Sequence, residues 1–591
     1  MQAPRAIMRT TVLIASFALG SIGGVALSAT GSVDDGSARR SCAVWTTIDL
    51  ALTSAAEHPW YEFPVAVSFV HADSGQELKI EGCWDGPRRW LVRFAPPTAG
   101  TWRYRTQSSD SRLAGVGGEI EAIAPAPGQL VDNPGLRGAI RISADGRTFQ
   151  YADGSPVLLL ADTLWGGNTA RCGLGDQADG PFHQYLADRR SKGFNTVLMR
   201  FLNGFGDEPN NPEGQRNEGG RAFLDRELTR LNPEYFRFLD RRMEAIRSAG
   251  MITAAPFSWW GKTKRCPIDF VTARRLSEYC AVRYGAFPSL WALSGEYQYA
   301  LTDCGWTPRQ FSALGEAVQR HNPYRTPLSI HPSSRLVAGN EHFQHQSSQA
   351  FHHEAWLDHN WLQTGQDVRS MFRIVGRTAE NRALSPVKPV FCSEACYERA
   401  SDPQGAYHAR WQAWAAYLSG SAGYGYGAFG VWQFYDPDDR EGETGKPSPE
   451  TIPWPEAMQL PGSAQVRHAV DLLREFSWNR LEPRRDVALV NGARARGPGA
   501  DDVSPPLCAA IPGEGYVVYL PRGNGGKLLE LNDLEPRRYA ASWFDPRTGN
   551  SHDVASLEYS GKRLRVPPPP TPGDEDWTFV LRTHRRQATT D

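Results

Sequence analysis

The chain runs from Met251-Ile-Thr-Ala-Ala-Pro-Phe257 through a helical pattern over 269–284 to Leu290-Trp-Ala-Leu-Ser-Gly-Glu296. Both quoted stretches are apolar runs of strand length, and a strand–helix–strand order is typical of a parallel sheet. The same alternation extends from residue 137 to residue 480. It predicts strands at 157–162, 194–201, 251–257, 290–296, 326–331, 355–362, 389–394 and 425–434, and helices near 182–192, 233–249, 269–284, 307–320, 367–382, 408–418 and 463–475. Eight units within about 340 residues favour a (β/α)8 TIM barrel over an open sheet.

The segments on either side of this predicted barrel are rich in short alternating strands. Examples are Phe63-Pro-Val-Ala-Val-Ser-Phe69 and Gly100-Thr-Trp-Arg-Tyr-Arg-Thr106 before the barrel, and Gly515-Tyr-Val-Val-Tyr-Leu520 after it. Short alternating strands between glycine and proline turns are typical of a β-sandwich. We therefore expect a multidomain protein, with an N-terminal β-sandwich at 41–125, the barrel at 137–480 and a small C-terminal β-sandwich domain at 485–583.

The first 28 residues have the layout of an export signal. Arg5 and Arg9 precede an apolar stretch that begins at Thr11 and ends in Ala26-Leu27-Ser28, an acceptable cleavage site. No later stretch approaches the run of about 18 apolar residues that a spanning helix needs. We therefore predict a signal peptide at 1–28 and a secreted or periplasmic protein with no stable membrane insertion after cleavage.

The composition narrows the range of partners. The 591 residues include 64 Lys and Arg against 65 Asp and Glu, a formal net charge of −1. A balanced charge provides no global field for nucleic acid, so we expect none as a partner. The 19 Trp, 20 Tyr and 25 Phe supply many flat apolar rings for a ligand such as a sugar. Nine cysteines are compatible with disulfides in an exported protein, but their spacing assigns no pairing.

Two acidic residues end the predicted strands four and seven. Glu296 follows Leu290-Trp-Ala-Leu-Ser-Gly, and Glu394 follows Pro389-Val-Phe-Cys-Ser. The reacting groups of a TIM barrel gather at the carboxyl ends of its strands, and strands four and seven lie across the mouth from each other. Glycosidic cleavage needs one protonated and one ionised carboxyl group in such a place. We therefore predict that Glu296 and Glu394 are the catalytic pair; the alternative is a pair of surface or ion-paired glutamates.

Other residues at the predicted strand ends are candidates for binding a carbohydrate. A cation at the end of strand two, Arg200, could keep the strand-seven carboxylate ionised, or it could form a salt bridge at the barrel rim. Tryptophan rings at strand ends favour a ligand cleft, although a single tryptophan is more often part of a core. The residues that we predict to bind substrate are Asp162, Trp165, Arg200, Trp259, Trp260, Tyr297, Gln298, His331 and Trp432.

Other kinds of chemistry have less support. Gly-x-Ser-x-Gly is absent, and the one GxGxxG, at 425–430, lies inside a predicted strand. A cluster of histidines has no recognised zinc spacing, so we expect no metal and no cofactor. Two alternatives stay open: a non-catalytic carbohydrate-binding or cell-surface protein on a barrel scaffold, and a metal-dependent hydrolase that uses the histidines. The clustered histidines are His331, His342, His345, His352, His353 and His359.

Four stretches resemble one known family. They are Leu159-Leu-Ala-Asp-Thr-Leu-Trp165, Phe194-Asn-Thr-Val-Leu-Met-Arg200, Arg283-Tyr-Gly-Ala-Phe-Pro-Ser-Leu-Trp-Ala-Leu-Ser-Gly-Glu-Tyr-Gln298 and Pro389-Val-Phe-Cys-Ser-Glu394. Over about residues 41–583 the chain is similar to the apiosidase-like glycoside hydrolases. These are barrel enzymes often preceded by an immunoglobulin-like domain and followed by a small β-domain for which collagen binding has been suggested. The resemblance implies a retaining glycosidase with Glu296 as acid/base and Glu394 as nucleophile.

The sequence departs from the family pattern in two places. Many members have aspartate where Glu296 stands, and Gly295 occupies the position at which related barrel glycosidases have an asparagine that binds the sugar 2-hydroxyl. We do not predict that the C-terminal domain binds collagen.

Together these observations predict an exported glycoside hydrolase that acts on a plant or microbial polysaccharide or oligosaccharide. The sugar, the linkage and the oligomeric state stay unassigned.

Overall fold

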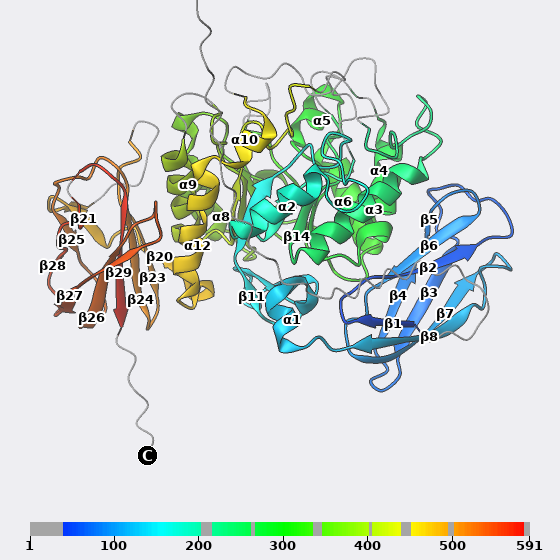
Figure 1. Ribbon diagram of the computed structural model, residues 1–591, viewed down its shortest axis with the longest axis horizontal. Helices are drawn as coiled ribbons and strands as arrows, with labels where there is room; N and C mark the ends of the chain where they lie inside the picture. Colours follow the sequence, from blue (N-terminus) through cyan, green and yellow to red (C-terminus); the bar gives the residue numbers. More distant parts are fainter. Residues whose placement is uncertain are drawn as a thin grey trace, which may run out of the picture.

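The structure is a computed structural model that describes residues 40–202, 216–261, 266, 268–334, 345–400, 405–438, 451–494, 502–571 and 573–583. A central barrel separates two strand-rich regions that lie on opposite sides of it (Figure 1). The predicted signal peptide lies outside the described residues. Within these ranges, no helix has both the length and the apolar character required to cross a membrane.

The central sheet confirms the predicted TIM barrel. Its eight strands pair in parallel in the order β16-β15-β14-β13-β12-β19-β18-β17, so that the first strand lies beside the last. Between β16 and the start of β17 the described ring is joined by hydrogen bonds from Asp358 N to Leu328 O, from Leu328 N to the Asp358 carboxylate and from the Ser329 hydroxyl to His359 O. The strands are β12 (Leu159–Thr163), β13 (Thr196–Leu198), β14 (Ile252–Pro256), β15 (Ser289–Ala292), β16 (Leu328–Ser329), β17 (Asn360–Gln363), β18 (Val390–Glu394) and β19 (Gly423–Tyr426).

Helices follow the strands in the expected alternation. Asn232, Asp269 and Thr307 each accept a hydrogen bond from the first turn of the helix that they begin, which satisfies backbone donors there. The helices of this region are α2 (Pro181–Ser191), α3 (Pro233–Ser248), α4 (Phe270–Tyr284), α5 (Gln298–Asp303), α6 (Pro308–Arg320), α7 (Ser348–Phe351), α8 (Arg373–Arg382), α9 (Ala406–Leu418), α10 (Trp454–Met458), α11 (Pro461–Gln465) and α12 (Arg467–Arg474), with 3-10 turns η2 (Val368–Ser370) and η3 (Trp478–Arg480).

The eighth strand differs most from its predicted bounds. It ends at Tyr426, whereas the prediction placed it at 425–434. Residues beyond Tyr426 form turns, in which Trp432 N bonds to Ala428 O and Tyr435 N bonds to Gly430 O. Gly430 has a φ of 103°, which a side chain rarely adopts and which interrupts an extended strand.

A small sheet closes one end of the barrel. It consists of β9 (Ile140–Ile142), β10 (Phe149–Tyr151) and β11 (Pro156–Val157), and it follows α1 (Pro127–Asp132) and η1 (Pro134–Arg137). Ile140 and Phe149 are buried in one cluster with inward residues of the barrel strands. The opposite end carries α5 and α10 (Figure 1), so the carboxyl ends of the strands are the end left free for a functional site.

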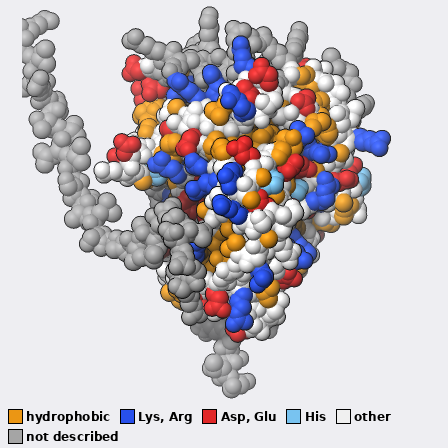
Figure 2. Space-filling model, turned by 90° about the vertical axis from the view of Figure 1, so that its right-hand side faces the viewer, with side chains coloured by type: hydrophobic (Ala, Val, Ile, Leu, Met, Phe, Trp, Pro, Cys, Tyr) orange, Lys and Arg blue, Asp and Glu red, His pale blue; other side chains and the backbone are white. Residues whose placement is uncertain are grey.

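The N-terminal region consists of two sheets around one core. A five-stranded sheet has the order β1-β8-β7-β3-β4, and a three-stranded sheet has the order β2-β6-β5. Val67, Phe69, Trp90 and Trp102 from both sheets are buried in a shared cluster. On the face that this region presents in Figure 2, basic and acidic side chains are interspersed. The strands are β1 (Arg40–Ala43), β2 (Ile48–Thr53), β3 (Val65–His71), β4 (Glu77–Glu81), β5 (Cys83–Trp84), β6 (Arg89–Phe94), β7 (Gly100–Ser108) and β8 (Gly117–Ile123).

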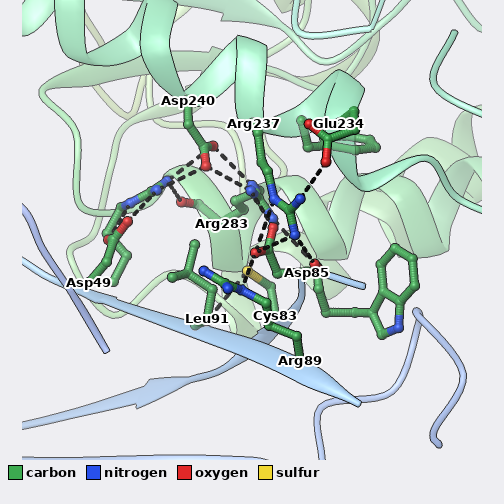
Figure 3. Close-up of polar contacts among 12 residues, drawn as sticks. Asp49, Cys83, Asp85, Arg89, Leu91, Glu234, Arg237, Asp240 and Arg283 are labelled. Carbon is green, nitrogen blue, oxygen red and sulfur yellow. Dashed lines mark hydrogen bonds and ion pairs between the residues drawn. The ribbon is translucent and has the colours of Figure 1, made fainter. Parts of the chain in front are cut away.

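A network of ion pairs connects the N-terminal region to the barrel helices (Figure 3). Arg93 of β6 pairs with Asp49 at 2.9 Å and with Asp240 of α3 at 3.0 Å. Arg283 of α4 pairs with Asp240 at 2.7 Å and with Asp85 at 3.0 Å. Burial alone would raise the pKa of Asp240, but Arg283 and Arg93 hold that pKa below its ordinary value. The carboxylate of Asp240 therefore stays ionised between two buried cations.

Replacing Asp240 with alanine is expected to destabilise the protein by about 3–5 kcal/mol. The change leaves the side chain of Arg283, which is 0% exposed, without one of its counter-charges. Because the pKa of Asp240 is lowered in the folded state, its contribution is present above the unfolded value of about 3.9 and is lost as the pH falls. Urea unfolding at neutral and acidic pH measures this effect. Asp553→Ala, on an exposed strand, is the control; equal stability of the two variants would contradict the role of the network.

The C-terminal region also consists of two sheets and packs against α9. Trp414 stacks on Tyr519 with ring centroids 5.6 Å apart, and Arg410 pairs with the buried Asp576 at 2.6 Å. The strand orders are β20-β23-β24-β29-β26-β27 and β22-β21-β25-β28. The strands are β20 (Glu482–Pro483), β21 (Ala488–Val490), β22 (Ala493–Arg494), β23 (Leu507–Ile511), β24 (Gly515–Leu520), β25 (Leu529–Leu531), β26 (Arg537–Phe544), β27 (Ser551–Tyr559), β28 (Leu564–Arg565) and β29 (Trp577–Thr583).

One disulfide, between Cys266 and Cys304, joins the segment after β14 to the end of α5. The sequence spacing had assigned no pairing. The other seven cysteines are free, and all but Cys42 are buried. The disulfide therefore lies at the carboxyl end of the barrel strands, close in sequence to Glu296.

Candidate active site

Glu296 and Glu394 both lie at the carboxyl ends of barrel strands. Glu394 is the last residue of β18. Strand β15 ends at Ala292, but Gly295 N bonds to Ser258 O, and His331 N bonds to Ser294 O. These bonds continue the pairing of neighbouring chains beyond β15, and they place Glu296 at the same end of the barrel as Glu394.

The Glu394 carboxylate is buried among hydrogen-bond donors. The Tyr397 hydroxyl donates to Oε1 at 2.6 Å, the Gln366 side-chain amide donates to Oε1 at 3.1 Å, and His331 Nε2 lies 2.7 Å from Oε2. Burial and the Glu394 charge raise the pKa of Tyr397 well above its ordinary value, so its hydroxyl keeps the proton that it donates. Glu394 is 6% exposed. Three polar side chains therefore hold the Glu394 carboxylate in one position.

The Glu296 carboxylate has fewer and longer hydrogen bonds. The Ser333 hydroxyl donates to Oε1 at 3.2 Å, and the Trp259 indole N–H donates to Oε2 at 3.2 Å. The residue is partly exposed, and its φ of 32° lies in the left-handed region. A residue other than glycine in this region costs energy, and such residues concentrate at functional sites. Glu296 is therefore the more accessible of the two carboxyl groups.

Three rings connect the two carboxylates. The centroid of Trp259 lies 6.1 Å from that of His331, and Trp165 lies 5.0 Å from Trp259 and 5.7 Å from His331. Trp259 donates to Glu296, and His331 contacts Glu394. The two acidic groups therefore border one aromatic cluster at the mouth of the barrel.

The packing of Trp259 explains why residue 295 is glycine. A Cβ atom at residue 295 would overlap the indole ring of Trp259. The asparagine of related barrel glycosidases has no space here, because the indole occupies the position of its side chain. The indole N–H is then aimed at Glu296, so the departure at residue 295 is coupled to a contact with this carboxylate.

Two further predicted residues lie near this cluster. The Arg200 guanidinium lies over the Trp259 ring at 5.5 Å from its centroid, so it contacts the ring that bonds Glu296. Trp432 is partly exposed and lies 6.3 Å from the Tyr397 ring, in the turns after β19 and not within the strand. Both positions agree with a place at the barrel mouth.

Four predicted substrate-binding residues have buried side chains with protein partners, which fit a structural role; a part in substrate binding stays a prediction. Asp162 is fully buried and accepts hydrogen bonds from Tyr185 at 2.8 Å and Arg189 at 2.7 Å, so it attaches β12 to α2. Burial raises the pKa of Asp162. The other three side chains also have protein partners: Trp260 donates to Leu293 O, Tyr297 packs its fully buried ring on Phe311 and Phe351, and Gln298 accepts from Ser333 N.

The structure adds Tyr397, Gln366 and Ser333 to the candidate site. All three follow a strand end by a few residues, Tyr397 after Glu394, Gln366 after β17 and Ser333 after His331. A polar residue shortly after a predicted strand end is a signal that could have identified them. The sequence alone does not distinguish them from ordinary loop residues.

The described histidines of this group do not form a common site. Apart from His331, each of its buried members has a different local partner: His345 bonds Gln363 O, His352 bonds Pro386 O and His359 accepts from the Trp361 indole. Burial lowers the pKa of His345 to about 4 and that of His359 to about 3. His353 is exposed, and His342 lies outside the described residues. In the described part of the chain, no three His, Cys, Asp or Glu residues are grouped to hold a metal ion.

A parallel eight-stranded barrel with carboxylates at the exits of its fourth and seventh strands has the architecture of barrel glycoside hydrolases, and solved structures share this fold. One described as a "putative glycoside hydrolase" from Bacteroides vulgatus is 16% identical, with 92% of this chain and 100% of that chain covered and a TM-score of 0.65. A glycoside hydrolase family 5 protein from the same organism is 17% identical, with 76% and 94% covered and a TM-score of 0.61. No curated protein matches the sequence.

The family is defined by a match to the sequence itself. A family model described as "Apiosidase-like, catalytic domain" matches residues 143–480, more than half of the chain, and the chain therefore belongs to the apiosidase-like family. The protein is therefore a glycoside hydrolase. Residues 41–109 match a domain of unknown function (DUF5060), and residues 505–582 match a domain described as "Putative collagen-binding domain of a collagenase".

Proposed function

We propose that this protein is an exported, retaining glycoside hydrolase that acts on a plant or microbial polysaccharide, with Glu394 as nucleophile and Glu296 as acid/base. The observation that carries the proposal is the difference between the two carboxyl groups. Glu394 is buried, accepts from Tyr397 and Gln366 and contacts His331, whereas Glu296 is more exposed and has two longer bonds. A nucleophile must be ionised, and an acid/base must exchange protons with a leaving group and with water.

The proposed reaction proceeds in two displacements. In the first, a Glu394 oxygen attacks the anomeric carbon, the glycosidic C–O bond breaks, and Glu296 transfers its proton to the departing oxygen. In the second, Glu296 takes a proton from water, the water oxygen bonds to the anomeric carbon, and the bond to Glu394 breaks. The sugar leaves with its original anomeric configuration, and both carboxyl groups return to their starting protonation states.

Export is supported by two independent features. The N-terminal sequence has the charged, apolar and small-residue parts of a signal peptide. The Cys266–Cys304 disulfide is of a kind that persists in oxidising compartments. Fractionation of cells that express the full chain, with the N-terminus of the mature protein sequenced, tests this part of the proposal. Mature protein in the cytoplasm with an intact residue 1 would contradict it.

The activity is tested by a screen of chromogenic glycosides and polysaccharides, with the product followed by NMR. We expect hydrolysis of at least one substrate, and we expect the first product to have the anomeric configuration of the substrate. Inversion would contradict the nucleophilic role of Glu394. Binding of sugars without hydrolysis over the whole panel would support a non-catalytic barrel, and loss of activity in chelator with recovery in zinc would support a metal-dependent hydrolase.

Tyr397→Phe is expected to lower kcat/KM by roughly tenfold to a hundredfold, because the Glu394 carboxylate loses a charge-assisted hydrogen bond. Steady-state kinetics with the substrate that the screen identifies measure this effect. Tyr61→Phe, in the N-terminal region, is the control, and an unchanged kcat/KM in Tyr397→Phe would contradict this contact.

A further inference from the structure

A cavity lies at the end of the barrel opposite Glu296 and Glu394, beside the C-terminal region. Its volume is about 570 Å³, within the range of roughly 300–1,000 Å³ that is typical of small-molecule sites. Its walls come from the turn between β9 and β10, the end of α8, the residues after α9, the segment 478–482 and Pro512. Leu158 and Ser421, which precede barrel strands, also line it, so it is separated from the carboxylate pair by the length of the barrel.

Two arginines line this cavity without a carboxylate partner. Arg147 Nη1 donates to the backbone oxygen of Arg382 at 3.0 Å, and Arg382 Nη1 donates to Gly420 O at 3.0 Å. Both side chains are partly buried, and neither forms an ion pair with any acidic side chain that the structure describes. A guanidinium has five N–H donors, so each group has donors left for a ligand.

The two positive charges are unfavourable to each other. Burial and the nearby charge of Arg147 lower the pKa of Arg382, and the more distant charges of Asp145 and Glu482 oppose this effect only in part. An anion bound by the two guanidinium groups would offset the repulsion between them and would accept bidentate hydrogen bonds. The cavity therefore favours a negatively charged ligand.

The acidic residues of the cavity act on the arginines only from a distance. Asp145 and Glu482 are both exposed, and neither forms an ion pair with Arg147 or Arg382 in the described part of the chain. Asp145 Oδ1 instead accepts from the Ser143 hydroxyl at 2.5 Å and from Arg147 N at 3.1 Å, which stabilises the turn between β9 and β10.

The remaining lining indicates a ligand larger than a free ion. Trp478 supplies an apolar ring, and Asn479 supplies an amide that has no hydrogen-bond partner in the described part of the chain. We propose that this cavity binds an anionic sugar unit, whose oxyanion contacts Arg147 and Arg382 and whose ring lies beside Trp478. The choice of a sugar as carrier of the charge rests on the proposed function, whereas the oxyanion site rests on the two arginines alone.

The test is isothermal titration calorimetry of the full chain with glucuronate, glucose and inorganic phosphate at constant ionic strength. We expect glucuronate to bind at least tenfold more tightly than glucose or phosphate. In the double variant Arg147→Gln with Arg382→Gln, the affinity for glucuronate should fall at least tenfold. The charge-matched control is Arg538→Gln with Arg565→Gln, two exposed positions in the C-terminal region, and it should bind as the parent protein does.

If the double arginine variant binds glucuronate as tightly as the parent does, the proposed oxyanion site is wrong. If phosphate binds as tightly as glucuronate, the proposed sugar ligand is wrong and free phosphate is the ligand. If the double variant does not fold, Arg147→Gln alone gives the same test, because this side chain makes a single hydrogen bond to the described protein. Glu394→Gln should bind glucuronate normally, so failure of this proposal is distinguishable from failure of the proposed catalysis.

Discussion

Glu394→Gln is expected to lower kcat by at least about 10⁴-fold on any glycoside that the protein hydrolyses. An amide oxygen is a poor nucleophile, so the covalent intermediate does not form, and losses of this size are typical when a nucleophile is removed. The amide also places an N–H₂ group among the donors Tyr397, Gln366 and His331. A moderate loss of stability of about 1–3 kcal/mol should accompany the kinetic effect.

The matched control is Glu316→Gln on the exposed face of α6, which should keep full activity. Circular dichroism and thermal unfolding verify that Glu394→Gln is folded at the assay temperature. A folded variant that keeps more than a tenth of the parent activity would exclude Glu394 as the nucleophile.

Glu296→Ala is expected to have an effect that depends on the leaving group. For a sugar leaving group, kcat/KM should fall by about 10²–10⁴-fold, because the departing oxygen receives no proton. For a dinitrophenyl leaving group, which departs without a proton, the first step should be nearly unchanged. The second step then becomes slow, since no base activates water, and a burst of dinitrophenol should precede the steady state.

Azide separates this interpretation from a general loss of structure. It needs no proton removal to attack, so it should accelerate the steady state of Glu296→Ala and give a glycosyl azide of retained configuration. Glu316→Ala serves as the control and should show no burst. Equal losses for both leaving groups, with no rescue by azide, would contradict the acid/base role of Glu296.

The fold could be predicted from the sequence because its strands are apolar runs separated by helices with clear ends. The helix predicted at 233–249 is α3 (Pro233–Ser248), and the strand predicted at 389–394 is β18 (Val390–Glu394). The bounds of glycine-rich strands were harder to predict. Gly423, Gly425 and Gly427 carry no apolar side chain that would mark where β19 ends. How β16 and β17 meet was also not predictable, because their contact depends on a few hydrogen bonds made just before β17 and not on a regular ladder.

The candidate site could be predicted in part, and the direction of side chains decides which residues face it. Neighbouring residues at a strand end face opposite sides, so Trp259 contacts Glu296 whereas Trp260 is fully buried and donates to Leu293 O. Asp162 likewise faces α2. A one-residue difference in register decides these cases, and sequence patterns locate strand ends only to within a few residues.

Two residues that the sequence did not identify act through contacts between distant segments. Gln366 reaches Glu394 from the segment after β17, and Ser333 reaches Glu296 from the segment after β16. No local pattern encodes such contacts. The ion-pair network at Asp240 and Arg283 was missed for the same reason, because its members come from two structural regions.

The most direct test of the central claim is mass spectrometry of the protein after reaction with a 2-deoxy-2-fluoro glycoside of the sugar that the substrate screen identifies. The fluorine slows breakdown of the glycosyl–enzyme intermediate, so the covalent adduct accumulates. We predict one added sugar per chain, attached to the carboxyl group of Glu394 and absent in Glu394→Gln. A sugar bound to another residue, or a reactive substrate that leaves no adduct, would contradict the assignment of Glu394 as nucleophile and Glu296 as its partner.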